Sequence, residues 1–166
     1  MSLLRRWDEL GWPMALARLL LGGWFVRLGL LKVADPVQFL KLLRQYDVVS
    51  DASPLLLTTL AALLPWLEIW CGLLLVLGVW VRGVALTMLV MLTTFTLLVA
   101  HHGAELAQQR GVPFCGVSFD CGCGTGEVNV CGKVLENSVL WLLALAALLS
   151  RSRSWCLARP AVTASR

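Results

Sequence analysis

The chain has 166 residues, of which 58% are apolar and only 14% are charged, whereas about 25% are charged in a typical soluble domain. Its formal net charge is +4 and its mean hydropathy is +0.78. These values exclude a disordered chain and a nucleic-acid-binding protein, and a soluble globule of this size could not bury so much apolar surface. We therefore expect an all-α integral membrane protein that contacts the lipid bilayer and binds no nucleic acid.

Four apolar segments predict four membrane-spanning helices, at about residues 13–31, 55–80, 83–100 and 134–150. Each is long enough to cross the hydrocarbon core, where a helix satisfies its own backbone groups. We expect residues 1–150 to form a single four-helix bundle domain and residues 151–166 to form a cytoplasmic tail. Residues 101–133 are expected to form a cysteine-rich loop outside the membrane.

The first two spans each carry a charge far from the membrane surface. Counted from the outer span ends at 1.5 Å per residue, Arg18 lies roughly 21 Å deep and Glu68 roughly 20 Å deep. A lone charge at this depth is costly, so it is expected to have a partner. The similar depths predict an ion pair between Arg18 and Glu68.

The connector after the first span predicts a short amphipathic helix. Asp35 and Pro36 form the sequence of a helix cap followed by a proline at the first helical position. Apolar residues then recur at helical spacing among polar ones. We interpret this segment as an interfacial helix on the outer leaflet, with a connector packed on the core as the alternative.

Aromatic residues surround the charge of the second span. Trp66 and Trp70 flank Glu68 near the middle of the membrane, and His101 lies where the third span ends on the outer side. This group could line a pocket for a quinone or a lipid head group, or it could simply pack around a structural ion pair. His101 is otherwise a wet interfacial residue or a haem ligand. The sequence fixes no cofactor, and a quinone is the candidate that it leaves open.

Four of the six cysteines lie close together between the last two spans, at Cys115, Cys121, Cys123 and Cys131. They could form structural disulfides in any of three connectivities, or a redox-active pair at Cys121 and Cys123, because a small strained ring is readily exchanged. Four thiolates could also bind zinc or an iron–sulfur cluster, but the short spacing fits such sites poorly. We predict exchange at Cys121 and Cys123, a second bridge or relay pair at Cys115 and Cys131, and no metal.

Charge predicts the orientation in the membrane. Both termini and the turn near Arg82 lie on one side and carry seven basic residues, against five on the other side, where six acidic residues offset them. Basic residues accumulate on the cytoplasmic side. We expect a multi-pass protein of the bacterial cytoplasmic (inner) membrane with both termini in the cytoplasm. The cysteine loop would then face the oxidising exterior, where disulfides persist.

Several motifs in this order resemble the DoxX-like superfamily. They are Arg18-x-x-x-Gly22, Gly29-Leu-Leu-Lys32-x-x-Asp35-Pro36-x-x-Phe39, Tyr46, Leu64-Pro65-Trp66-Leu67-Glu68 and Gly72-Leu-Leu-Leu-x-Leu-Gly78 with Arg82. The sequence Cys121-Gly122-Cys123-Gly124 before the last span, with Asn137 in it, resembles the MauE branch. The resemblance covers about residues 14–149. Cys115, Cys131 and Glu136 depart from the pattern expected for that branch.

The resemblance implies a four-helix membrane bundle associated with redox chemistry. MauE-like proteins are linked to maturation of methylamine dehydrogenase, beside a thioredoxin-like periplasmic partner, and other DoxX relatives to thiosulfate:quinone oxidoreduction or thiol-oxidant defence. By motif position, Cys121 and Cys123 would carry the redox role. Arg18, Lys32 and Glu68 would form the polar core of the family within the membrane.

Two functions follow as hypotheses. The first is a redox-associated membrane protein whose cysteine loop exchanges disulfides with an extracytoplasmic thioredoxin-like or other redox partner, or supports its maturation. The second is a small non-catalytic accessory subunit of a larger respiratory or photosynthetic membrane complex, with the stapled loop as its docking surface. The sequence does not settle whether the chain is an enzyme.

Overall fold

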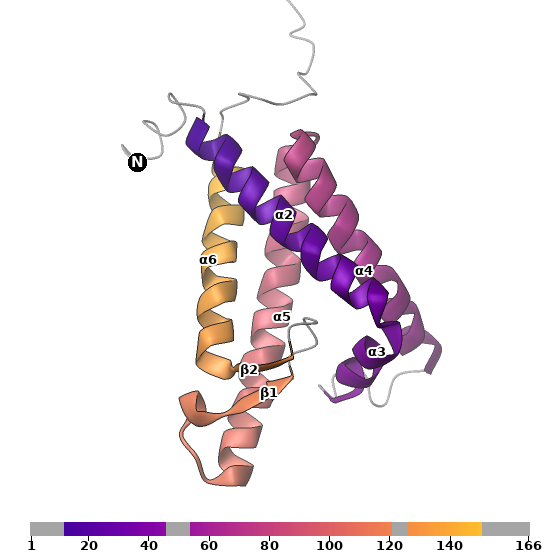
Figure 1. Cartoon of the computed structure of the whole chain (residues 1–166). Coiled ribbons are helices and arrows are strands. Elements are labelled where there is room, and N and C mark those ends of the chain that lie inside the picture. Colours follow the sequence, from indigo (N-terminus) through magenta and orange to yellow (C-terminus); the bar gives the residue numbers. More distant parts are fainter. Residues whose placement is uncertain (1–11, 46–53, 121–125, 151–166) are drawn as a thin grey trace, which may run out of the picture.

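The computed structural model describes residues 12–45, 54–120 and 126–150. In chain order the elements are α2 (Trp12–Ala34), α3 (Pro36–Gln45), α4 (Pro54–Leu77), α5 (Val81–Arg110), the 3-10 helix η1 (Phe114–Gly116), β1 (Ser118–Asp120), β2 (Glu127–Asn129) and α6 (Val130–Leu149) (Figure 1). Helices α2, α4, α5 and α6 are long and apolar enough to span a membrane. The predicted all-α membrane bundle is confirmed, and lipid contacts follow from the many exposed leucines on these helices.

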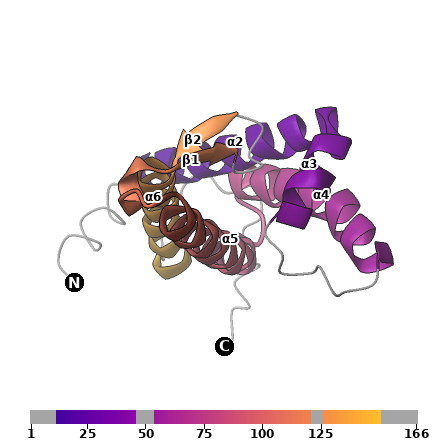
Figure 2. The ribbon, with the colours of Figure 1, turned by 90° about the horizontal axis from the view of Figure 1, so that it is seen from below.

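The four long helices associate as two pairs, α2 with α4 and α5 with α6 (Figures 1 and 2). In the first pair the backbones touch at glycines. A Cβ atom added to Gly22 would lie 2.6 Å from the carbonyl oxygen of Gly72, and one added to Gly29 would lie 2.7 Å from that of Pro65. Small residues at a membrane interface permit such an approach. This contact fixes how α2 and α4 are aligned along their length.

Helix α5 is longer than the sequence predicts, because it ends at Arg110 and not near residue 100. The first ten residues of the predicted loop therefore continue the helix. Gly111 ends it in the left-handed conformation, with φ 63°, which glycine adopts without steric cost. Apolar composition predicted only the lipid-compatible part of this helix, because the remaining residues, 101–110, are largely polar.

The short helix α3 begins as its sequence predicts. The side chain of Asp35 accepts a hydrogen bond from the backbone N–H of Gln38 at 2.9 Å, which caps the first turn. Phe39 and Leu42 are buried against the bundle, whereas Val37 is exposed. The helix is thus amphipathic and covers one end of the bundle, the end that also carries the β-hairpin (Figure 1).

Two separate cores divide the molecule. The larger one gathers buried residues of all four long helices toward the α4–α5 turn, including Leu75 and Met88, which are fully buried. The smaller one seats the β-hairpin, in which β1 and β2 pair antiparallel, through Val99, Val117 and Val130. Between the two cores the helix pairs enclose a cavity.

Candidate functional site

A cavity of about 250 Å³ lies between the two helix pairs, toward the hairpin end of the bundle. Every long helix contributes to its wall, and α3 closes it with Phe39, Leu42 and Leu43. Most of the lining is apolar. The exceptions include four buried side chains, which we call the polar cluster: Lys32, Glu68, Lys133 and Asn137. Buried charges and amides inside a membrane bundle mark a candidate functional site.

Lys32 and Glu68 form a buried ion pair between α2 and α4. The ammonium group of Lys32 also lies 5.2 Å from the ring centroid of Phe39 and 5.9 Å from that of Phe95. Both rings attract a cation through their electron-rich faces. One lysine of α2 thus contacts a carboxylate on α4 and aromatic rings on α3 and α5, which places it at the centre of the site.

The predicted ion pair between Arg18 and Glu68 is wrong, because Glu68 pairs with Lys32. The contact of Gly22 with Gly72 sets the alignment of α2 and α4. In this antiparallel pair Arg18 lies one turn before Gly22 and Glu68 lies one turn before Gly72. The two charges are therefore on opposite sides of the contact, about 12 Å apart along the axis. The prediction assumed that the outer ends of the two spans lie at the same level, whereas the helices are staggered.

Helix α6 supplies the other half of the polar cluster. The ammonium group of Lys133 donates to Glu136 at 3.1 Å, and the indole N–H of Trp24 on α2 donates to the same oxygen at 3.1 Å. Asn137 lies one helical turn beyond Lys133, on the same face, and is 2% exposed. These bonds connect α6 with α2 beside the cavity.

The residues predicted to form a quinone or lipid pocket do not line this cavity. Trp66 and Trp70 are 53% and 62% exposed on the outward face of α4, although Glu68 between them points inward. His101 is exposed on α5, and its Nδ1 atom lies 3.8 Å from Oε1 of Glu105. Pro65 is inside α4 and adjoins Gly29 of α2. The proline therefore lies at a helix contact and not at a pocket wall.

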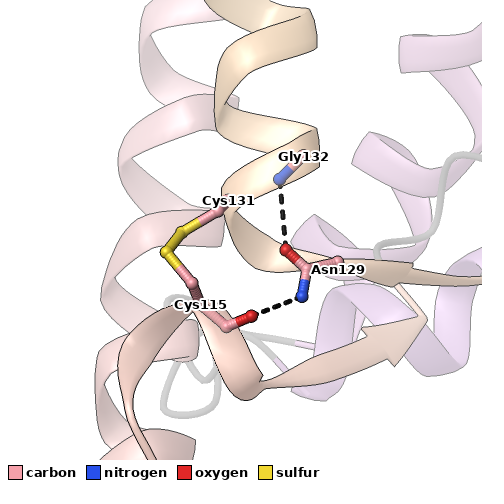
Figure 3. Close-up of a disulfide and its surroundings, with 4 residues drawn as sticks. All are labelled: Cys115, Asn129, Cys131 and Gly132. Atoms are coloured by element: carbon pink, nitrogen blue, oxygen red, sulfur yellow. Dashed lines mark hydrogen bonds between the residues drawn. A yellow bond between two sulfur atoms is a disulfide. The ribbon is translucent and has the colours of Figure 1, made fainter.

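Cys115 and Cys131 form a disulfide that joins η1 to the first turn of α6 (Figure 3). Asn129 supports the same junction, because its side chain accepts from the N–H of Gly132 at 3.2 Å and donates to the carbonyl oxygen of Cys115. Cys121 and Cys123 lie outside the described residues, as does Cys156. Among the described residues Cys71 is a free, buried thiol in α4.

Sequence reasoning missed two members of the polar cluster. The sequence motifs do not single out Lys133, and they include Asn137 only as a position in the last span. A signal was present in the spacing, because Lys133, Glu136 and Asn137 fall at i, i+3 and i+4 at the start of an apolar helix. This spacing places the three polar groups on one face of the helix. Since lipid disfavours such groups, that face is expected to point into the bundle.

Comparison with known proteins adds one finding. The model of the family described as "Methylamine utilisation protein MauE" matches residues 10–150. No curated protein and no solved structure matches the chain. The match includes helices α2 to α6, the disulfide and the polar cluster, so these features lie within the family's domain.

Proposed function

We propose, since this chain belongs to the MauE family of methylamine utilisation proteins, that it supports disulfide formation in an extracytoplasmic redox partner through its cysteine loop. The family membership and the four apolar helices make it a multi-pass membrane protein of a methylamine utilisation system. The exchange chemistry and the thioredoxin-like partner are the parts proposed.

The observation that carries this proposal is the Cys115–Cys131 disulfide. Because these two cysteines are joined to each other, Cys121 and Cys123 can bond only to each other or to a thiol elsewhere. They fall between the paired strands β1 and β2, whose last register pair is Asp120 with Glu127. This second pair would then be the exchangeable one.

The proposed exchange needs no metal. A thiolate of the reduced partner attacks one sulfur of a Cys121–Cys123 disulfide and forms a mixed disulfide, which releases the other cysteine as a thiolate. The second thiolate of the partner then attacks the mixed disulfide. The partner loses two electrons and two protons and becomes oxidised, and Cys121 and Cys123 become the reduced pair.

We further propose the orientation with both termini in the cytoplasm, in the bacterial inner membrane, on the basis of the charge distribution. One family model matches residues 10–150, which supports a single domain, with residues 151–166 proposed as its cytoplasmic tail. The wider relationship to DoxX-like proteins rests on the motif residues alone. Arg18, Lys32 and Glu68 would then be the shared polar core, and all three are buried here.

The test is capture of the mixed disulfide. Replacing Cys123 by Ser leaves Cys121 as a single thiol, whose thiolate can attack the disulfide of the oxidised partner in the reverse of the proposed exchange. Without Cys123 to release it, the mixed disulfide should persist and appear on a non-reducing gel of membranes prepared with acid-quenched thiols. Mass spectrometry then identifies the attached protein and the cysteine that holds it.

Two matched variants interpret the result. Cys71→Ala leaves the loop intact and should behave as wild type, and the double variant C121S/C123S should capture nothing and lose maturation of the partner. If C121S/C123S keeps full function and Cys123→Ser captures no partner, the exchange proposal is wrong. Purification at fixed stoichiometry with a larger complex would then favour the accessory-subunit hypothesis.

A further inference from the structure

We propose that the cavity between the two helix pairs binds the head group of a neutral, lipid-soluble quinone or quinol. This site differs from the aromatic group that the sequence singled out, and its residues take no part in the proposed disulfide exchange. Its walls are mostly apolar, with Phe25, Phe39 and Phe95 among them, and the polar cluster belongs to the same lining. Apolar walls with a few placed polar groups are characteristic of small-molecule sites.

Two atoms of the polar cluster lack a hydrogen-bond partner in the structure. They are Oε2 of Glu68, which is an acceptor, and Nδ2 of Asn137, which is a donor. Both residues are more than nine-tenths buried, at 8% and 2% exposed, and both line the cavity. A buried polar atom without a partner is costly, so these two atoms indicate a ligand with complementary groups.

The charges around the cavity favour a neutral ligand. Lys32 pairs with Glu68, and Lys133 pairs with Glu136, so the formal charges of the two lysines are already balanced. A phosphate or a carboxylate would meet no excess positive charge here. A quinone carbonyl would instead accept from the amide of Asn137, and a quinol hydroxyl would donate to the carboxylate of Glu68.

The cavity is accessible from the side of the bundle that faces lipid. Val90 and Thr94 of α5 belong to its lining, and yet both are exposed, with Val90 at 59%. A molecule dissolved in the bilayer can therefore reach it without crossing the hairpin. At about 250 Å³, the cavity is just below the range of about 300–1,000 Å³ for whole small ligands, which suits a ring whose tail remains in the lipid.

Binding can be measured on the full chain in phospholipid nanodiscs, with decylubiquinone as the probe and calorimetric titration as the readout. We expect saturable binding of one molecule per chain. Asn137→Leu removes the donor at similar volume and should weaken binding by about three- to tenfold. Thr94→Trp fills the lateral opening, leaves the polar cluster intact and should abolish binding.

The matched control is Ser138→Ala, which changes the exposed neighbour of Asn137 and should leave binding unchanged, since its hydroxyl is bonded to its own helix. C121S/C123S should also bind normally, which separates this proposal from disulfide exchange. An azido-quinone should label peptides of α5 and α6. The proposal would be overturned by non-saturable partitioning or by equal binding to all variants. It would also be overturned by labelling confined to Trp66 and Trp70, or by displacement of the quinone by oleate at equal concentration.

Discussion

The two helix pairs are held together by different means. In α2–α4 the backbones touch at Gly22 and Gly72, and one buried ion pair adds a polar bond. In α5–α6 the hairpin end is closed by the Cys115–Cys131 disulfide, and farther along Trp141 donates to Thr93 at 3.0 Å. Each pair is tight within itself. The cavity lies between the pairs, away from the glycine contact and the disulfide, so the open space follows from how the helices are paired.

The largest effect is expected where the α2–α4 pair depends on a buried charge. Glu68→Leu leaves the ammonium group of Lys32 in the bundle without its carboxylate. Breaking a buried ion pair from one side typically costs about 3–5 kcal/mol. The free energy of unfolding, measured by reversible SDS titration in mixed micelles, should fall by this amount.

The double variant Lys32→Met with Glu68→Leu is the control, because it removes both charges at similar volume and should recover most of the loss. Equal stability of Glu68→Leu and wild type would show that Lys32 does not depend on this carboxylate. The two helix pairs would then differ only in that α2–α4 is held by the glycine contact and α5–α6 by the disulfide.

The second prediction concerns the α5–α6 pair. Cys131→Ser removes a disulfide whose cysteines are 16 residues apart in the sequence. Loss of a cross-link that closes a loop of this length lowers the free energy of unfolding by about 3 kcal/mol. The same titration should show the loss. Ser118→Ala, on the exposed side of β1, serves as the control in the same hairpin.

The effect should stay within the second pair, because the disulfide joins η1 only to α6. Binding of decylubiquinone should therefore survive in Cys131→Ser. A loss of the whole bundle on reduction would contradict the independence of the two pairs.

The difference between the pairs also explains what the sequence could predict. The four spans and the cap at Asp35 are local properties, set by hydropathy over about 20 residues and by one side chain near the backbone. The expectation that Glu68 needs a partner was also sound, because burial in lipid imposes it. These features require no knowledge of how helices are aligned.

The identity of the partner was not predictable in this way. Whether Glu68 pairs with Arg18 or with Lys32 depends on the stagger of α2 against α4. That stagger is set by the contact of Gly22 with Gly72. The sequence shows only that these residues are small, and not that they touch. A bridge or relay pair at Cys115 and Cys131 was predicted, but spacing alone leaves three connectivities open and could not choose among them. Trp66 and Trp70 were expected near the pocket because they flank Glu68, but on a helix residues two positions apart face different directions.

The third prediction tests the glycine contact with two neighbouring positions. A Cβ atom at Gly22 would meet the carbonyl oxygen of Gly72 at 2.6 Å and a methyl group of Val76 at 2.8 Å, whereas one at Gly23 would meet nothing within 4 Å. Gly22→Ala should lower the free energy of unfolding by about 2 kcal/mol, as overpacking does. Gly23→Ala should be neutral or slightly stabilising, since alanine favours helix. Equal stability of the two variants would show that the backbones do not touch.

The smallest effects are expected from two indole hydrogen bonds, one between the pairs and one within a pair. Trp24→Phe removes the bond from α2 to Glu136 on α6, and Trp141→Phe removes the bond to Thr93 inside the second pair. Hydrogen bonds between membrane helices average about 0.6 kcal/mol, with values up to about 1.7 kcal/mol. We expect a loss of about 1 kcal/mol for Trp24→Phe, whose acceptor is a carboxylate, and of about 0.6 kcal/mol for Trp141→Phe.

Only Trp24→Phe should also change quinone binding, because Glu136 balances the charge of Lys133 at the cavity. If Trp141→Phe changed binding as much as Trp24→Phe, quinone binding would show no specific dependence on the bond that connects the two pairs.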